Sequence, residues 1–136
     1  MLHHLVYLSR ATQPFSDAEL LDLLTQARLH NASQDISGLL VYGNNQFLQV
    51  LEGEEKPIRT LYEHIRKDPR HHDVITYADK DIAVRAFPDW GMAFQPVSPT
   101  QFEELVGYLP PAKLSFEQAG ATDGQLLRTL RGFVLG

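Results

Sequence analysis

Residues 39–53 read LLVYGNNQFLQVLEG and set the architecture expected of this chain. The two ends of this stretch, 39–42 and 46–52, are rich in apolar residues and have the length of strands. The Gly-Asn-Asn run at 43–45 between them is typical of a tight turn. The sequence therefore predicts a β-hairpin at this point.

Gln49 is unusual in the second strand of this hairpin, because strands favour β-branched and aromatic residues. Apolar neighbours flank it on both faces, so its carboxamide is expected to point into the core or into a pocket. A buried amide without partners costs about 1–3 kcal/mol. We therefore expect a side chain, a water molecule or a ligand to meet it. A core glutamine that is hydrogen-bonded within the protein is the alternative.

The segments around the hairpin carry their own signals. Ser16 and Glu19 have the spacing of a capping box, which predicts the start of a helix. Asp68 followed by Pro69 is expected to stop a second helix that begins near Pro57. The elements expected besides the hairpin are a strand at 3–9, a helix at about 17–30, a loop at 31–35, a helix at 57–67, and strands at 74–78 and near 90–94.

The resulting order, β-α-β-β-α-β-β, predicts an α+β ferredoxin-like sandwich with one sheet and two helices on one face. A short C-terminal helical extension follows, with a second capping box expected at Thr100 and Glu103 and a last helix capped by Asp123. We expect the extension to cover the open face of the sheet or to make a subunit contact, and Leu126, Leu127 and Leu130 are candidates for that role. The predicted division is 1–97 for the sandwich and 98–136 for the extension.

Composition narrows the classes of function. A chain of 136 residues without cysteine has no disulfides, no thiolate metal site and no cysteinyl adduct chemistry. A net charge of −5 argues against a nucleic-acid surface, which would be basic. No apolar run approaches the roughly 20 residues that span a bilayer, and no signal peptide is seen. We therefore expect a cytoplasmic, soluble protein that contacts neither nucleic acid nor membrane.

Several polar residues could form a site. Tyr7 lies in the first strand, which neighbours the third in a ferredoxin-like sheet, so Tyr7 and Gln49 could meet as a cross-strand pair. Packing alone is the alternative for Tyr7. Asn31 is expected either to cap the first helix at its C-terminal end or to contact a ligand between the helices. Arg70 could present its guanidinium to a carbonyl or phosphate, or lie on the surface.

Catalytic and metal-binding signals are weak. The six histidines are adjacent or dispersed, without the spacing of a metal site, so no metal is expected. The carboxylates of Glu52, Glu54 and Glu55 look solvated, and no acid/base pair or glycine-rich phosphate loop is evident. Trp90 and Met92 are expected in the last strand, where core packing is the simplest role. The chain is therefore not expected to be an enzyme.

Taken together, the chain resembles the BLUF family of blue-light sensors that use flavin, over about residues 2–97. The resemblance rests on five motifs that occur in the family's order and spacing. They are Val6-Tyr7-Leu8-Ser9-Arg10, Asn31 with Ile36-Ser37-Gly38-Leu39-Leu40, Phe47-Leu48-Gln49-Val50-Leu51-Glu52-Gly53, Asp68-Pro69-Arg70-His71-His72, and Phe87-Pro88-Asp89-Trp90-Gly91-Met92.

The resemblance implies a role for each matching residue. Tyr7 would give an electron and a proton to the excited flavin, and Gln49 would bridge Tyr7 to the ring and rearrange after light. Trp90 and Met92 would be the last-strand pair whose placement changes with the state of Gln49. The implied cofactor-binding residues are Tyr7, Leu23, His30, Asn31, Gln49, Ile65, Asp68, Arg70 and His71.

Some positions depart from the form of these motifs that we consider most frequent. His30 stands where a second asparagine is often found, Asp35 replaces a glycine and Ser37 replaces a threonine. Both Tyr7 and Gln49 are present, so these departures concern only local contacts with the ring.

The resemblance thus implies a stand-alone blue-light photoreceptor that binds flavin without a covalent bond. FAD is the expected cofactor, with FMN or riboflavin as alternatives. Its output is expected to pass to a separate protein partner or through a change of homo-oligomer. Two other readings stay open: a small flavin-dependent reductase that uses the same pocket, and a ligand-sensing regulatory domain without a light response.

Overall fold

The computed structural model describes residues 2–88, 91–107 and 127–130 of the chain. Within these residues the elements follow the predicted order, and a helix of the predicted C-terminal extension comes after the last strand. They are β1 (Leu2–Ala11), α1 (Asp17–Gln34), β2 (Ser37–Gly43), β3 (Gln46–Glu54), α2 (Glu55–Lys67), β4 (His71–Asp81), β5 (Ala93–Pro96) and α3 (Pro99–Val106).

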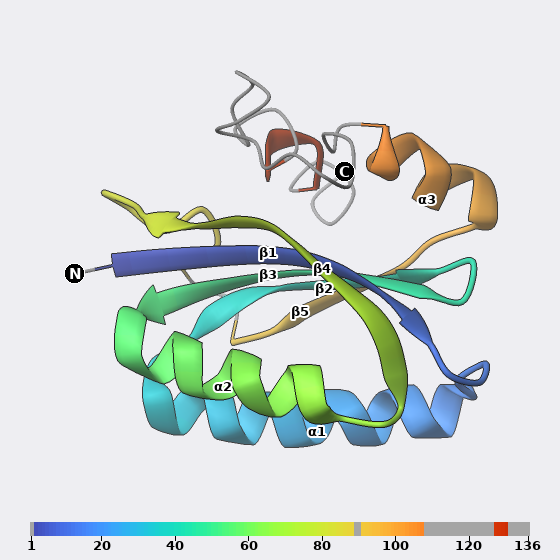
Figure 1. The fold of residues 1–136 in the computed structure, drawn as a ribbon, viewed down its shortest axis with the longest axis horizontal. Coiled ribbons are helices and arrows are strands. Elements are labelled where there is room, and N and C mark those ends of the chain that lie inside the picture. The colour runs from blue at the N-terminus through green and yellow to red at the C-terminus, as the bar shows by residue number, and fades with distance from the viewer. Residues whose placement is uncertain (1, 89–90, 108–126, 131–136) are drawn as a thin grey trace.

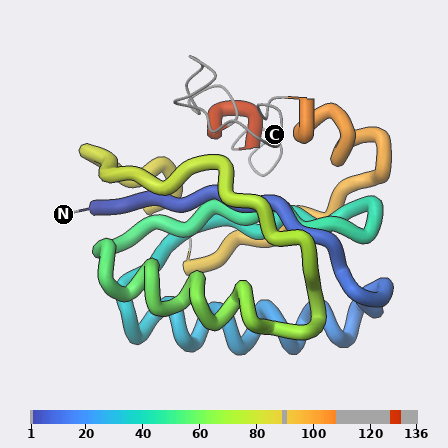
Figure 2. Tube along the Cα trace, in the orientation of Figure 1, coloured from blue at the N-terminus to red at the C-terminus, as the bar shows by residue number. Residues whose placement is uncertain are grey.

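The five strands form one sheet in the order β4-β1-β3-β2-β5. β5 runs parallel to β2, and the other neighbours are antiparallel. Both α1 and α2 cover one face of the sheet, whereas α3 lies on the opposite side (Figure 1). The same layers can be followed along the Cα trace, where β1 runs between β3 and β4 (Figure 2). This is the α+β ferredoxin-like arrangement that the sequence predicts.

The hairpin at the centre of the prediction is confirmed. Asn44 and Asn45 both have positive φ, 51° and 58°, which suits a two-residue turn between twisted strands. Gly38 has a φ of 154°, and a Cβ there would lie 1.9 Å from the carbonyl oxygen of Val50. Only glycine therefore lets β2 approach the strand that carries Gln49 so closely.

Side chains alternate between two apolar layers, one on each face of the sheet. The layer beneath α1 and α2 contains Leu5, Tyr7, Leu40, Phe47 and Leu51 together with helix residues. The layer on the other face contains, from the sheet, Val6, Leu39, Val41, Leu48 and Val50, and from the extension, Phe102, Leu105 and Leu130. The described part of the extension thus covers the open face of the sheet, as one of the two expectations stated.

The first helix is longer than predicted. The capping box of Ser16 and Glu19 is confirmed, but the helix runs to Gln34 rather than about residue 30. Asp35 is its C-cap, in the left-handed conformation (φ 54°) that aspartate tolerates better than most residues. The prediction of Asn31 as the C-cap is therefore wrong: Asn31 lies one turn inside the helix, and its carbonyl oxygen accepts from the backbone N–H groups of Asp35 and Ile36.

The start of the last strand and the cap of the next helix also differ from the prediction, and β4 (His71–Asp81) is longer than the predicted 74–78. The last strand begins at Ala93, so Met92 precedes it, and Trp90 lies outside the described residues. The helix that follows is capped by Ser98 with Gln101, not by Thr100 with Glu103. Proline suits the first helical position, so Pro99 favours the earlier start. The predicted cap Asp123 also lies outside the described residues.

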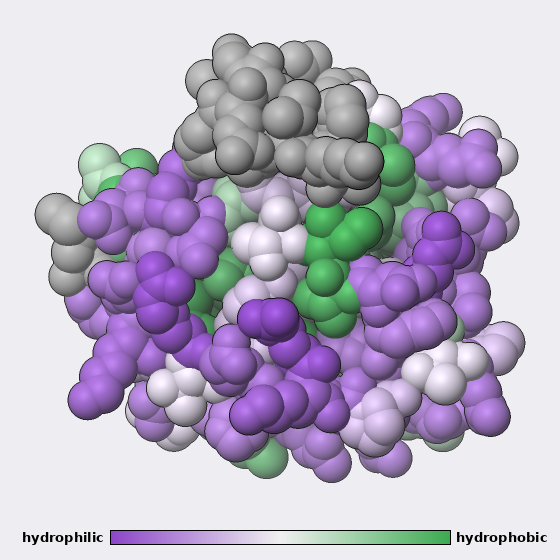
Figure 3. Space-filling view, in the orientation of Figure 1, coloured by the Kyte–Doolittle hydropathy of each residue, from purple (hydrophilic) through white to green (hydrophobic). Residues whose placement is uncertain are grey.

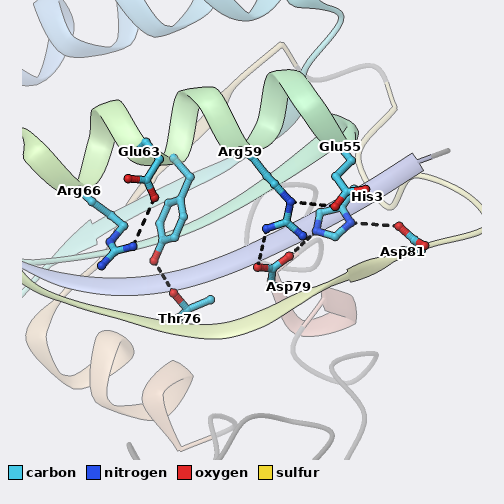
Figure 4. A network of polar contacts seen from close by, with 9 residues as sticks. His3, Glu55, Arg59, Glu63, Arg66, Thr76, Asp79 and Asp81 are labelled. Carbon is cyan, nitrogen blue, oxygen red and sulfur yellow. Dashed lines mark hydrogen bonds and ion pairs between the residues drawn. The ribbon is translucent and has the colours of Figure 1, made fainter.

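The helix α2 is amphipathic, and an ion pair near its start ties it to the sheet. Its inner side buries Ile58 and Tyr62, while charged side chains cover the outside, where the surface is mainly hydrophilic (Figure 3). Figure 4 shows how Arg59 joins Glu55 of the same helix at 2.7 Å and Asp79 of β4 at 3.1 Å.

Buried His3 of β1 holds the end of β4 in the same network. Its Nδ1 lies 3.1 Å from Asp81, and its Nε2 contacts Asp79 (Figure 4). Burial raises the pKa of Asp79, but hydrogen bonds from His3 and Arg59 outweigh it and lower that pKa overall.

Among the described residues, no helix combines the length and the apolar character needed to cross a bilayer.

Candidate functional site

A cavity of about 240 Å³ lies between the two long helices and the sheet. Its walls are mostly apolar, with polar groups from the sheet and from the ends of the helices. All nine residues expected to bind the cofactor line it: Tyr7, Leu23, His30, Asn31, Gln49, Ile65, Asp68, Arg70 and His71. The other lining residues were not among those expected to bind the cofactor; they are Phe15, Gln26, Ala27, Leu40, Phe47, Leu61 and His64.

Tyr7 and Gln49 form a buried hydrogen-bonded pair in this cavity. They face each other in the register of β1 and β3, and the side chains are 3% and 6% exposed. The Tyr7 hydroxyl donates to Oε1 of Gln49. The cross-strand pair that the sequence suggested is therefore formed, because antiparallel pairing places directly opposed residues within reach of each other.

The environment keeps the Tyr7 hydroxyl protonated. Burial raises the pKa of Tyr7 far above its ordinary value, and the nearby Tyr62 and Asp68 raise it further. The ring of Tyr62 lies 5.5 Å from that of Tyr7, centroid to centroid. The neutral phenol therefore keeps its proton, and we expect Tyr7 to release the proton only after the phenol has been oxidised.

The other end of the Gln49 amide rests on a weak partner. Its Nε2 lies 3.5 Å from Sδ of Met92, which is 2% exposed. A thioether sulfur is a weak acceptor compared with oxygen or an aromatic nitrogen. The Gln49 NH₂ group can therefore donate a hydrogen bond to a stronger acceptor placed in the cavity. Met92 does not line that cavity, but it contacts Gln49, which does.

Two side chains of α1 hold the segment that carries Met92. Nδ2 of Asn31 donates to the carbonyl oxygen of Gly91 at 2.8 Å, and Nε of Arg28 donates to that of Met92 at 3.0 Å. Asn31 was expected to contact a ligand or to cap the helix; it lines the cavity, and part of its amide is used by Gly91. Arg28 was missed, because an arginine in a helix gives no signal of a partner 64 residues later.

The far end of the cavity is organised by Asp68, Arg70 and His71. Arg70 clamps Asp68, with Nε at 3.0 Å from both carboxylate oxygens and Nη2 at 2.6 Å from Oδ2. The hydrogen bonds from Arg70 lower the pKa of Asp68. Nδ1 of His71 lies 2.8 Å from the Ser9 hydroxyl, and Nε2 contacts the Ile65 carbonyl oxygen. Each of these polar groups is thus held in place by the protein.

One carboxylate expected to be solvated is in fact buried. Glu52 is 0% exposed and accepts from two backbone N–H groups of the connection between β4 and β5. Strand alternation puts it on the face opposite to Gln49. The expectation failed because Glu52 was grouped with Glu54 and Glu55, which are exposed, and the partners of Glu52 come from a distant part of the chain.

The cavity suits a flat aromatic ligand with hydrogen-bond acceptors along one edge. Apolar side chains from both helices, including Leu23 and Ile65, would pack on its faces. The N–H of Gln49 that now meets only a sulfur would donate to the acceptor edge. These are the demands of an oxidised flavin ring, so the residues present fit that cofactor.

Comparison with known proteins agrees with this geometry. The family model BLUF, described as "Sensors of blue-light using FAD", matches residues 2–93. The photoactivated adenylate cyclase subunit beta of Euglena longa is 38% identical over 108 residues, which are 79% of this chain and 12% of that protein. The blue light- and temperature-regulated antirepressor BluF of Escherichia coli is 28% identical over 92 residues, or 68% of this chain and 23% of that protein.

Solved structures are similar over nearly the whole chain. BlrB, a BLUF protein in its dark state, has a TM-score of 0.75 and 28% identity, covering 96% of each chain. The ground state of BlsA has a TM-score of 0.76 and 28% identity, covering 100% of this chain and 89% of the other. By contrast, this chain spans only 12% of the length of the Euglena longa cyclase subunit.

Proposed function

This chain belongs to the BLUF family of flavin-binding blue-light sensors, and from that premise we propose which of its residues carry the response to light. Tyr7 is the donor of an electron and a proton. Gln49 is the element that rearranges. Leu23, Asn31 and Ile65 hold the ring, with His30, Asp68, Arg70 and His71 at the edges of the pocket.

One observation carries the proposal: the buried bond from the Tyr7 hydroxyl to Gln49, with the other end of the amide resting on a sulfur. A bound flavin supplies the absorption of blue light and the oxidising power that follows it. Tyr7 is the electron donor within the pocket, and its hydroxyl proton starts toward Oε1 of Gln49. Because the buried phenol holds its proton tightly while neutral, it releases the proton only once it has lost the electron.

Gln49 responds because its hydrogen bonds depend on Tyr7. While the phenolic oxygen of Tyr7 lacks its proton it can only accept a hydrogen bond, so it no longer donates to Oε1 of Gln49, and the amide is free to rotate or tautomerise. Tyr7 then recovers both the electron and the proton, so the net change is confined to the amide and its partners. An amide can satisfy either orientation, since one end donates and the other accepts. The rearranged amide persists because turning back requires both hydrogen bonds to be broken.

The experiment is an absorption spectrum of the purified protein, loaded with FAD, FMN or riboflavin, before and after blue light. We expect a small red shift that reverses in the dark. Tyr7→Phe and Gln49→Leu should bind flavin and lose the shift. Tyr62→Phe is the matched control, because it removes a phenol 5.5 Å away that bonds to Thr76 instead, and it should keep the shift.

Three results would count against the proposal. A normal photocycle in Tyr7→Phe or Gln49→Leu would refute the assigned roles. Bleaching of the yellow protein by NADH would favour a reductase. A protein that stays colourless when flavin is offered would favour a sensor of another ligand.

The signal leaves this chain, we propose, through a protein partner or a second copy. Met92 contacts Gln49 and lies directly before β5, which is an edge strand. A rearranged amide can therefore displace Met92 and shift the edge of the sheet. Leu130 and Phe102 pack on the opposite face, so a shift of the sheet would also reach the extension. Light scattering after gel filtration, in the dark and under blue light, tests the oligomer. An unchanged mass in both conditions would overturn the change of oligomer.

A further inference from the structure

Glu52 is a buried carboxylate with an unusual set of partners. Its Oε2 accepts from the backbone N–H of Ala86 at 2.6 Å, and its Oε1 accepts from that of Phe87 at 2.9 Å. The Ser37 hydroxyl donates to the same Oε1 at 3.3 Å. A carboxylate buried without partners would be costly, whereas one that accepts several bonds holds its donors firmly. Glu52 therefore fastens the connection between β4 and β5 to the sheet.

Arg85 reinforces the attachment from outside. Its Nη1 donates to the Ser37 hydroxyl at 2.9 Å, and its Nη2 donates to the carbonyl oxygen of Asp35 at 2.8 Å. The guanidinium thus links the connection to the start of β2 and to the C-cap of α1. The guanidinium and the Glu52 carboxylate therefore share the Ser37 hydroxyl, and Nη1 of Arg85 also lies 3.4 Å from the backbone carbonyl oxygen of Glu52.

We propose that Glu52 is a positioning residue for the light response: it holds the connection so that Met92 stays against Gln49, and it thereby sets how long the light state lasts. The inference rests on the proposed function of Gln49. Phe87, next to Ala86, is 1% exposed, and Met92 follows five residues later with its own carbonyl oxygen bound by Arg28. The connection is thus fastened at residues 86 and 87, and Met92 is fastened at its own carbonyl oxygen.

The direction of the effect follows from packing. Gln49 and Met92 are both buried, and close-packed interiors resist the rotation of a side chain. If residues 86 and 87 lose their acceptor, Met92 can move back from the amide and leave it room to turn. The return of Gln49 to its dark orientation then meets a lower barrier, so the light state decays faster.

The first test is the rate of dark recovery after blue light in flavin-loaded Glu52→Gln. The substitution keeps the shape and one acceptor oxygen, but its NH₂ group faces a backbone N–H, so one of the two bonds is lost. We expect recovery at least about threefold faster, with the size of the red shift retained. Glu54→Gln is the matched control, because it removes the same charge from an exposed residue of the same strand, and its recovery should equal that of the wild type.

The second test does not depend on the photocycle. Hydrogen exchange of backbone amides, followed by NMR in the dark, should be faster at Ala86 and Phe87 in Glu52→Gln and unchanged in Glu54→Gln. Arg85→Gln is the milder variant if Glu52→Gln does not fold. It removes the outer bonds but leaves both bonds from the backbone to Glu52, so we expect an intermediate gain in both exchange and recovery rate.

The outcomes separate this inference from the proposed function. Faster exchange with unchanged dark recovery would overturn the role of Glu52 in the light response. Unchanged exchange at residues 86 and 87 would overturn the attachment itself. If the wild type showed no reversible shift, the proposed function would fail, and with it the link to the light state.

Discussion

Replacing Tyr7 with phenylalanine should remove a specific part of the alkaline instability of this protein. Burial raises the pKa of Tyr7 far above its ordinary value near 10, so the folded protein keeps the phenol neutral when the unfolded chain has begun to ionise. A raised folded pKa means that the stabilisation is complete below pH 10 and is lost as the pH rises above it. The lost free energy of unfolding is about 1.4 kcal/mol at pH 11 for one such group.

The measurement is urea unfolding at pH 8 and pH 11, followed by far-ultraviolet circular dichroism, on flavin-loaded protein. The fall in unfolding free energy between the two pH values should be about 1.4 kcal/mol smaller in Tyr7→Phe than in the wild type. Burial also raises the pKa of Tyr62 and Tyr77, but both are present in the two proteins and cancel in the difference. The flavin contributes equally to both and cancels as well.

Gln49→Leu serves as the control, because it removes the partner of the hydroxyl but leaves the ring of Tyr7 buried. Burial is the largest cause of the raised pKa, so this variant should keep the full alkaline loss. An equal loss in wild type and Tyr7→Phe would refute the reasoning. It would mean that Tyr7 ionises in the fold as readily as in the unfolded chain, and that burial does not strengthen its hold on the proton.

Three further outcomes are expected. Ser16→Ala removes the cap of α1 and should lower the free energy of unfolding by about 1 kcal/mol in urea denaturation; no change would show that the capping box adds nothing. Met92→Leu should cost less than about 1.5 kcal/mol and keep the reversible shift, because Gln49 remains bonded to Tyr7; loss of the shift would show that the sulfur is required. Arg70→Gln should raise the pKa of Asp68 toward its ordinary value in an NMR titration, since the side-chain hydrogen bonds of Arg70 are the largest cause of the depression; an unmoved pKa would assign the depression to another group.

Local patterns in the sequence account for most of the fold. The hairpin, the first capping box and the stop at Asp68-Pro69 depend on a few adjacent residues, and each occurs as predicted. Boundaries were less certain where two local signals competed. The sequence pattern stopped α1 at Asn31, but Asp35 accepts the left-handed conformation, so the helix gains another turn. Pro99 likewise moves the cap of α3 from Thr100 to Ser98.

The chemistry of the pocket could be predicted from the sequence because Gln49 is a polar residue in an otherwise apolar strand, and the family motifs then suggested its partners. Everything that depends on the approach of distant segments had no such signal. The bond from Arg28 to Met92 and the burial of Glu52 join residues 64 and 34 or more positions apart. Only the packed structure brings these groups together, because a hydrogen bond forms only at about 3 Å, and the sequence around either partner does not indicate the other.

The sequence by itself therefore determined the order of elements, the pairing of Tyr7 with Gln49 and the family. The tertiary structure decided what surrounds that pair: which residues hold Met92, how firmly Tyr7 keeps its proton, and that Glu52 is buried. The physical reason is that conformational preference and alternation are properties of neighbouring residues, whereas burial and electrostatic environment arise only when layers close over one another.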